Sequence, residues 1–273
     1  MRFAVSYSPQ FNGVDPDRIV EYARRAEECG FEAFYLPEHI ALYPGAMFGA
    51  FELPPALPYL DPLDCLSFVA AATSRILLAT GVLLLPYHHP VVLAKRLATI
   101  DVLSRGRMRL LTVGLGSLPG EAQAAGVDFG SRGRRADEAI DVLRLLWAGD
   151  AEGVSFHGEF FDFDRLVSFP KPYHATRLPI HVGGSSRAAA RRAGLRGDGY
   201  FPGGAAYPEL VRAAAIEAGR DPSPLDYTRW GSIDMTAEHV AALAAQGVTR
   251  IVVGADEPER LAGFASRFGL SLR

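Results

Sequence analysis

Residues 80–116 read TGVLLLPYHHPVVLAKRLATIDVLSRGRMRLLTVGLG, and this stretch decides the fold class of the chain. Its first apolar run, which ends at Pro86, predicts a buried strand, and the pattern over residues 90–104 predicts a helix. An Arg-Gly-Arg turn then leads into a second apolar run that ends in Gly-Leu-Gly at residues 114–116. Strand, helix and strand in this order form a unit with two parallel strands and a right-handed crossover.

The same alternation extends over the whole chain. We predict eight strands, at residues 2–8, 33–36, 76–85, 108–114, 178–182, 198–201, 227–233 and 250–253. Helical patterns lie between them, at residues 16–29, 61–74, 90–104, 135–147, 187–192, 237–246 and 258–268. Eight such units in a single domain of 273 residues favour an α/β fold of the closed (β/α)8 TIM-barrel type, with an open doubly wound sheet as the alternative.

Residues 149–177 interrupt the alternation with an irregular, aromatic segment. This segment is too long for an ordinary connection between two elements. We therefore expect an insertion between strands four and five that folds over the strand ends. Its aromatic residues either form the wall of a site for a flat ring or pack as an ordinary insertion; they are Phe156, Phe160, Phe161 and Phe163.

The composition is 49 % hydrophobic and 22 % charged, which is typical of a globular chain with one large core. The net charge of −3 gives no support for nucleic acid or an anionic membrane as a partner. We expect no signal peptide and no transmembrane segment, because the chain begins with the strand-like RFAVSYS and lacks a membrane-length apolar run. Cys29 and Cys65 are expected to be free thiols of a cytoplasmic protein rather than a disulfide.

In a parallel barrel, the active site lies at the C-terminal ends of the strands. Strand five ends there in Gly183, Gly184, Ser185 and Ser186, directly before a helix. Glycines let a ligand approach the backbone, and the hydroxyls and the helix N-terminus favour an anion, so this turn predicts a phosphate site. A second glycine pair after strand six, in Pro202-Gly203-Gly204, supports that prediction. The alternative is a plain helix cap made by Ser185 or Ser186.

Strand two ends in Glu38-His39, and His39 is the strongest acid–base candidate because imidazole titrates near neutral pH. Glu38 points to the opposite face if the strand is regular, so only one of the two is expected to face the cavity. The alternative for His39 is a hydrogen-bonded structural histidine. The pair His88-His89 has poor geometry for a metal and no acidic or cysteine cluster beside it, so we predict no metal site. One of that pair is expected to line the cavity and the other to face solvent.

Residues 80–116 also resemble the luciferase-like monooxygenase superfamily. Its members carry a strand ending in Gly-Val, a His-Pro-x-x-x-Ala-Lys helix start, a Thr-x-Asp-x-Leu-Ser helix and an Arg-x-x-Leu-x-x-Gly-x-Gly strand. Further matching motifs follow in order along nearly the whole chain: Glu-His at 38–39, FHGEFFDFDRLVSFPKP at 156–172, PIHVGGSS at 179–186 and DGYFPGG at 198–204. The segment around residues 149–186 is most similar to the branch of F420-dependent oxidoreductases.

The resemblance implies a cofactor, coenzyme F420 (a deazaflavin) or alternatively FMN. It implies that the phosphate lies at residues 183–186 and the ring over the end of strand three. F420-type relatives often carry a non-proline cis peptide there, matching Gly81-Val82, and Val82 would press on the back of the ring. His39 matches the residue that contacts the reacting centre. The predicted site residues are catalytic His39 and cofactor-binding Glu38, Gly81, Val82, Gly114, Gly116, Gly183, Gly184, Ser185, Ser186, Pro202 and Gly203.

One position departs from the family. The sugar-phosphate dehydrogenase branch has an acidic residue after the strand-four glycine pair, whereas this chain has Ser117, which argues against that substrate class. The apolar loop at residues 44–58 suggests an apolar or aromatic substrate instead. We therefore expect an F420-dependent oxidoreductase that transfers a hydride between the deazaflavin and a small organic substrate. The alternatives are an FMN-dependent monooxygenase of the same superfamily and a barrel that binds a flavin without turnover.

The helices after strands two and three are unusually apolar. Such faces form a two-fold interface in many proteins, so we expect a homodimer, with ordinary barrel packing as the alternative explanation. The residues concerned are Cys65, Leu66, Phe68, Val69, Val91, Val92 and Leu93.

Overall fold

A computed structural model of the chain describes residues 1–271. Eight parallel strands close into a barrel in the order β1-β12-β11-β10-β9-β6-β5-β2. They are β1 (Arg2–Ser6), β2 (Ala33–Leu36), β5 (Leu77–Leu84), β6 (Met108–Gly114), β9 (Ile180–Gly183), β10 (Gly199–Phe201), β11 (Asp226–Ser232) and β12 (Arg250–Gly254). The predicted (β/α)8 barrel is confirmed, and the open sheet is wrong, because β1 pairs with both β2 and β12.

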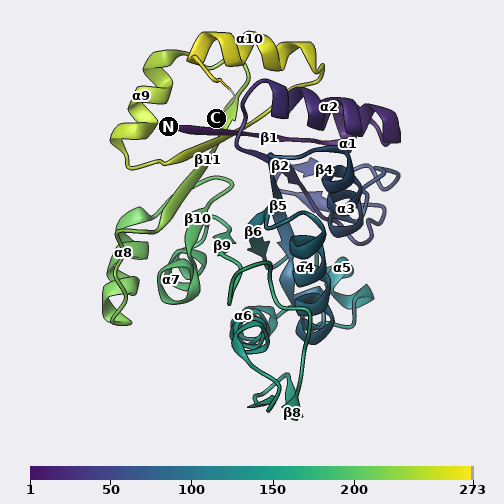
Figure 1. Ribbon diagram of the computed structural model, residues 1–273, viewed down its shortest axis with the longest axis vertical. Helices are drawn as coiled ribbons and strands as arrows, with labels where there is room; N and C mark the ends of the chain where they lie inside the picture. Colours follow the sequence, from purple (N-terminus) through teal and green to yellow (C-terminus); the bar gives the residue numbers. More distant parts are fainter. Residues whose placement is uncertain (272–273) are drawn as a thin grey trace.

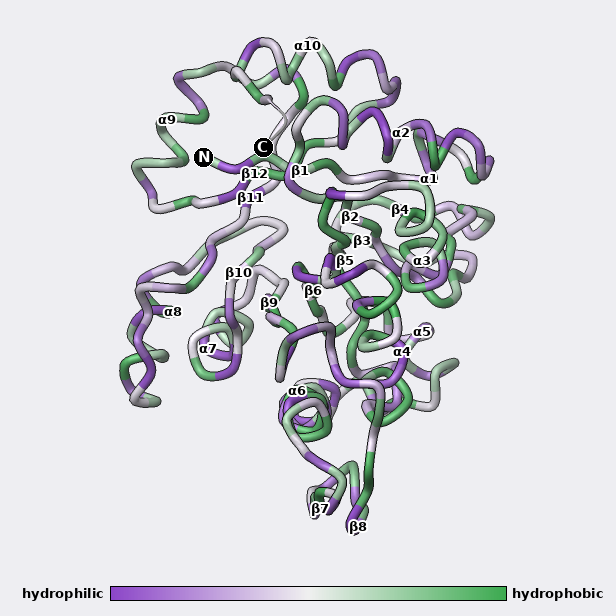
Figure 2. The backbone as a smooth tube through the Cα atoms, in the orientation of Figure 1, coloured by the Kyte–Doolittle hydropathy of each residue, from purple (hydrophilic) through white to green (hydrophobic). Residues whose placement is uncertain are grey.

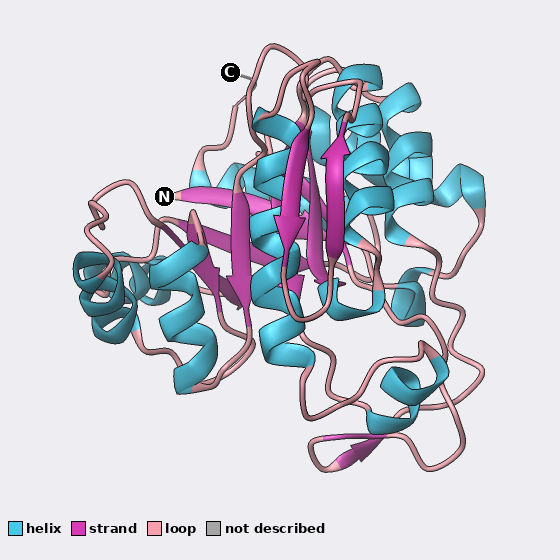
Figure 3. Ribbon diagram, turned by 90° about the horizontal axis from the view of Figure 1, so that it is seen from below, coloured by secondary structure: helices cyan, strands magenta, loops and turns pink. Residues whose placement is uncertain are grey.

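Helices surround the strands on the outside of the barrel (Figures 1 and 3). They are α1 (Pro9–Asn12), α2 (Pro16–Glu28), α3 (Pro62–Ala72), α4 (Pro90–Leu103), α5 (Pro119–Ala124), α6 (Arg132–Ala148), α7 (Arg187–Arg196), α8 (Pro208–Glu217), α9 (Ala237–Ala245) and α10 (Glu259–Phe268), with a 3-10 turn at Leu85–Tyr87. Helices α1, α5 and α8 were not predicted, although each begins with a proline at its first position. None of these helices combines the length and apolarity needed to cross a bilayer.

The predicted helix starts at Asp15-Pro16 and Asp61-Pro62 are confirmed. The Asp15 carboxylate accepts hydrogen bonds of 3.0 Å from the backbone N–H groups of residues 17 and 18. The Asp61 carboxylate does the same for residues 63 and 64, at 2.9 and 3.0 Å. These caps satisfy N–H groups that have no partner inside the helix, which is why an Asp-Pro pair locates a helix start so well.

The segment at residues 149–177 forms a hairpin of β7 (Val154–His157) and β8 (Asp162–Leu166). Its turn packs against α6, where the Glu138 carboxylate accepts hydrogen bonds from the N–H groups of Glu159 and Phe160 at 2.7 and 2.9 Å. The hairpin therefore lies beside α6, at the edge of the molecule (Figure 1), and the expectation that it folds over the strand ends is wrong. The physical reason is that Glu138 of α6 supplies an acceptor for the backbone N–H groups of the turn.

The aromatic residues of the hairpin follow the packing alternative. The rings of Phe156 and Phe163 stack on each other with centroids 6.2 Å apart. Phe161 is buried between the His89 ring, 5.5 Å away, and the Arg135 guanidinium, 4.7 Å from its ring centre. These rings pack within the hairpin and against residues next to and within the helices, as the packing alternative predicts.

The apolar faces of α3 and α4 are mostly used inside the chain. Figure 2 shows the hydrophobic residues along both helices. Four of the seven residues expected at a dimer interface are buried within the chain; they are Cys65, Leu66, Val69 and Leu93. Phe68 and Val92 remain 47 % and 59 % exposed, so the homodimer stays a prediction that rests on a smaller patch.

The middle of the barrel is filled by a compact apolar layer. Alanines from β1, β2 and β5 leave room for the larger side chains of the layer, which gives the dense packing typical of protein interiors. The layer consists of Ala4, Ala33, Tyr35, Ala79, Leu110, Phe201 and Val252, with Leu77 at its edge.

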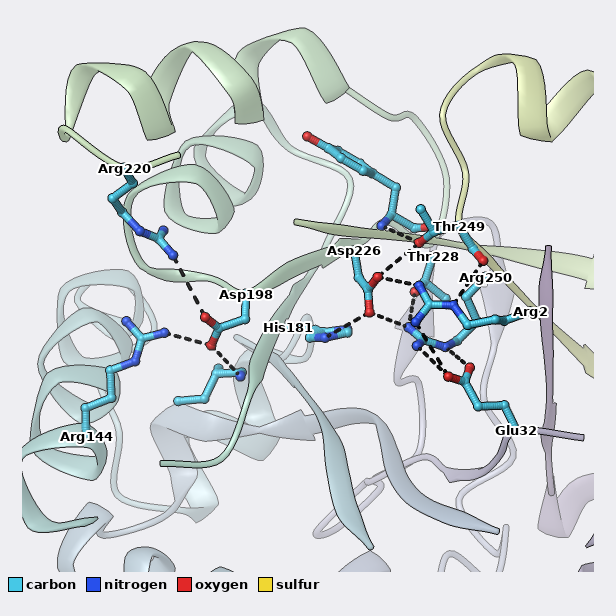
Figure 4. A network of polar contacts seen from close by, with 12 residues as sticks. Arg2, Glu32, Arg144, His181, Asp198, Arg220, Asp226, Thr228, Thr249 and Arg250 are labelled. Atoms are coloured by element: carbon cyan, nitrogen blue, oxygen red, sulfur yellow. Dashed lines mark hydrogen bonds and ion pairs between the residues drawn. The ribbon is translucent and has the colours of Figure 1, made fainter. Parts of the chain in front are cut away.

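A charged network closes the N-terminal end of the barrel (Figure 4). The Arg250 guanidinium is 1 % exposed and donates to both oxygens of Glu32, at 2.6 and 3.1 Å, and to Asp226 at 3.2 Å. The His181 ring lies beside this network, with Nε2 3.9 Å from Asp226. Burial, reinforced by the positive charge of Arg250, lowers the pKa of His181 to about 4.

This low pKa makes a prediction about stability. The unfolded chain takes up a proton at His181 below pH of about 6.5, whereas the folded chain takes it up only near pH of about 4. The free energy of unfolding therefore decreases as the pH is lowered across that window. At the acidic end of the window, His181 should have lowered the free energy of unfolding by about 3 kcal/mol. Urea unfolding at several pH values should show that His181→Gln flattens the dependence between pH of about 6.5 and 4. An unchanged slope in this variant would show that another group is responsible.

Candidate active site

A cavity of about 540 Å³ lies at the C-terminal mouth of the barrel. Its lining comes from the ends of several strands and from the loops after them: Ser6, Ser8, Phe11, Asn12, Pro37, Tyr59, Gly81, Trp230, Gly254, Ala255, Asp256 and Arg260. A second cavity, of about 430 Å³, lies at the opposite end. The active site of a parallel barrel lies at the C-terminal ends of its strands, and His39 follows such an end, that of β2, so the mouth is the candidate active site.

Val82 fills a space between glycines at the edge of this mouth. The Gly81-Val82 peptide is cis, as the family resemblance implies, and the pairing register of β5 with β6 shifts at this point. A Cβ atom on Gly114 would lie 2.5 Å from Val82 Cγ2, and one on Gly183 would lie 2.6 Å from Val82 Cγ1. The ends of β5, β6 and β9 therefore meet at Val82, and four predicted site residues are brought together.

His39 lies beside the mouth and is held by a buried carboxylate. Its Nδ1 is 3.3 and 3.2 Å from the two oxygens of Glu121. The first of these oxygens also accepts a hydrogen bond of 2.6 Å from the backbone N–H of Ile40. The Tyr59 ring, which belongs to the cavity lining, meets the imidazole edge-on, with centroids 4.8 Å apart. His39 is thus hydrogen-bonded and, at 16 % side-chain exposure, still accessible.

The sequence analysis missed Glu121 and Tyr59. Glu121 lies in the first turn of α5, a six-residue helix, and its side chain is fully buried. A signal was present, since a proline starts that helix at residue 119 and a carboxylate follows two residues later. Nothing in the spacing, however, indicates that this carboxylate reaches the end of strand two, 82 residues earlier.

Glu38 turns toward the end of β5 rather than toward the cavity. One of its oxygens accepts a hydrogen bond of 2.5 Å from the Leu84 N–H, and the other lies 2.9 Å from His88 Nε2. Both carboxylate oxygens are therefore engaged, and His88 is the histidine that points inward. His89 is exposed and precedes α4. Within residues 1–271, no three histidine, cysteine or acidic side chains gather closely enough to hold a metal ion.

The turn after β9 is arranged by both of its serines. Ser186 caps α7, because its hydroxyl accepts a hydrogen bond of 3.1 Å from the Ala189 N–H. The Ser185 hydroxyl accepts one of 2.7 Å from the Gly204 N–H and so ties the turn to the loop after β10. Gly184 has a φ of +107°, which requires glycine. The exposed turn thus unites the two glycine pairs at the start of a ten-residue helix.

Gly116 makes room for Tyr87. It has a φ of +76°, and a Cβ atom there would overlap the Tyr87 hydroxyl. That hydroxyl is buried and has no hydrogen-bond partner in residues 1–271. Burial, together with the nearby Glu121 charge, raises the pKa of Tyr87 to about 12, so the hydroxyl is a neutral donor available at the site.

Comparison with known proteins agrees with this geometry. The family model of luciferase-like monooxygenases matches residues 1–263, and the chain belongs to this family. It is accordingly an enzyme of the oxidoreductase class. An F420-dependent hydroxymycolic acid dehydrogenase of Mycobacterium tuberculosis is 33 % identical over 252 residues, covering 89 % of this chain and 66 % of that relative.

Two further similar proteins are matched over a larger share of their own length. An uncharacterized protein of Mycobacterium tuberculosis is 33 % identical over 248 residues, which cover 86 % of this chain and 84 % of the relative. The solved structure of an F420-dependent secondary alcohol dehydrogenase, in complex with an F420–acetone adduct, has a TM-score of 0.79 over the full length of both chains. Its sequence identity is 18 %, so this match supports the fold.

The glycine contacts of Val82 yield a prediction. Gly114→Ala should lower the free energy of unfolding by about 1–3 kcal/mol, because the added methyl group overlaps the Val82 side chain. The double variant Gly114→Ala/Val82→Ala should recover much of that loss, since every close contact of the new methyl group is with Val82. Denaturant unfolding of the wild type, the two single variants and the double variant measures this coupling. Strictly additive effects would rule out the contact.

Proposed function

We propose that this protein is an F420-dependent oxidoreductase that transfers a hydride between the deazaflavin and a small organic substrate. The observation that carries the proposal is the position of Val82 between Gly114 and Gly183 at the mouth of the barrel, where His39 follows the end of β2. A relative that is 33 % identical and is named as an F420-dependent dehydrogenase supports it.

The residues at the mouth fit such a cofactor. Gly114 and Gly183 have no side chain, so Val82 fills the space between them, which suits it to support a flat ring. Gly184, Ser185 and the N-terminus of α7 would hold the phosphate of the tail, because free N–H groups at a helix start attract anions. Bound there, F420 would supply the hydride acceptor or donor that no amino-acid side chain provides.

His39 would carry the proton. An alcohol that loses a hydride from carbon must also lose its hydroxyl proton, and a neutral imidazole accepts a proton readily near neutral pH. Its side chain is partly exposed and contacts the ring of Tyr59, a residue of the cavity lining. In the reverse direction the imidazolium would return the proton to the substrate oxygen.

The surroundings favour an apolar substrate. Phe11 and Trp230 line the cavity and are 67 % and 40 % exposed, so an apolar ligand would cover them. Ser117 takes the place of the acidic residue found in the sugar-phosphate branch. We also propose a cytoplasmic location, supported by the free thiols of Cys29 and Cys65.

Cofactor choice is the first test. Equilibrium dialysis of the protein against F420 and, separately, against FMN should show retention of F420, detected by its absorption spectrum. Tight retention of FMN without F420 would replace the proposal by the alternative function, an FMN-dependent monooxygenase, which the family name also covers.

The second test concerns His39. His39→Ala should lower kcat with a secondary alcohol by about 10²- to 10⁴-fold, because it removes the proton acceptor, while F420 binding is retained. His239→Ala, on the exposed α9, is the matched control and should keep full activity. Equal turnover of the His39 and His239 variants would show that the acid–base assignment is wrong.

A further inference from the structure

We propose that Glu121 is a positioning residue for His39, whose carboxylate selects the imidazole tautomer that can accept a proton from the substrate. The inference rests on the proposed function, because His39 is the proton acceptor there. It adds a residue that the sequence motifs do not contain, supplied by a short helix between strand four and α6.

The contacts determine which nitrogen carries the proton. An ionised carboxylate offers only acceptors, so the Nδ1 atom that lies 3.2 Å from Glu121 must be the protonated nitrogen of a neutral His39. Nε2, at the opposite corner of the ring, then has a free lone pair. No hydrogen-bond partner for Nε2 occurs in residues 1–271, so this atom is available to a substrate hydroxyl.

The burial of Glu121 explains why its carboxylate needs this contact. The carboxylate is fully buried, and an unpaired buried charge is costly. In residues 1–271 it pairs with no lysine or arginine; its donors are the His39 ring and the backbone N–H groups of Ile40 and Ala41, at 2.6 and 3.4 Å. The imidazole is thus the only side chain among these donors.

Tyr59 also restricts the ring. It meets the imidazole edge-on at 4.8 Å, so a ring flip, which would put Cδ2 in the place of Nδ1, takes place against a half-buried aromatic ring. The N–H groups of residues 40 and 41 bind the same carboxylate and fix it relative to the backbone that carries His39. Orientation and tautomer are therefore set together.

In the proposed reaction the substrate alcohol loses a proton and a hydride. The substrate O–H bond breaks and its proton joins His39 Nε2, while the C–H bond breaks and its electron pair leaves as hydride to the deazaflavin of the proposed function. The substrate becomes a carbonyl compound. His39 becomes an imidazolium whose positive charge faces the Glu121 carboxylate, which stabilises it.

Glu121→Gln is a sharp test because it changes the acceptor with almost no change in shape. The amide oxygen can still accept from the Ile40 N–H, which leaves the amide NH2 facing Nδ1. The imidazole must then accept at Nδ1 and carry its proton on Nε2, where it blocks the substrate. Glu21→Gln, at an exposed position on α2, is the matched control.

The first readout needs neither cofactor nor substrate. NMR of 15N-histidine-labelled protein at alkaline pH distinguishes the two tautomers, and the His39 signals are assigned by their loss in His39→Ala. Wild type and Glu21→Gln should show Nδ1–H, and Glu121→Gln should show Nε2–H. A wild-type Nε2–H tautomer, or an unchanged tautomer in Glu121→Gln, would overturn the proposal even if the protein proved to bind FMN.

The second readout is turnover with F420 and a secondary alcohol. Glu121→Gln should lower kcat by about 10²- to 10⁴-fold with KM within a few-fold of wild type, while Glu21→Gln matches wild type. A reversed tautomer with unchanged kcat would overturn the catalytic importance of the contact. Failure of the wild type to use F420 would overturn the proposed function, and the tautomer measurement would still decide the pairing.

Discussion

The pairing of β1 with β12 on one side and β2 on the other is the constraint on which the rest of the structure depends. Val5 pairs with Val253 and with Phe34, and these contacts convert a row of parallel strands into a closed barrel. Because all eight strands run in the same direction, closure brings their C-terminal ends to one mouth. Residues that are far apart along the chain thereby become neighbours.

The two ends of the barrel have different chemistry. At the N-terminal end, Arg250 is buried with Glu32 and Asp226, and each charge has a partner of opposite sign. An apolar layer that includes Tyr35 and Phe201 separates this network from the mouth. The charged end therefore closes the barrel, and the C-terminal end, where side chains are replaced by glycines, is left open for a ligand.

The mouth itself combines space with one well-held titratable group. Val82 occupies the gap left by Gly114 and Gly183, where the ends of three strands meet. His39 lies beside the mouth, and its Nδ1 contacts the buried Glu121 carboxylate. In the proposed function, Val82 would support the flat ring of the cofactor and His39 would carry the proton.

The amino-acid sequence determined the barrel and much of its mouth. Alternating patterns, Asp-Pro helix starts and glycine turns are local signals, so they located nearly all barrel strands, and motif resemblance led to Gly81, Val82 and His39. Tertiary structure alone decided that the hairpin at residues 149–177 packs on α6, that Glu38 turns toward His88, and that Glu121 reaches His39. The reason is physical: a backbone pattern depends on neighbouring residues, whereas the partner of a buried charge depends on which distant segments the closed barrel brings within hydrogen-bond distance.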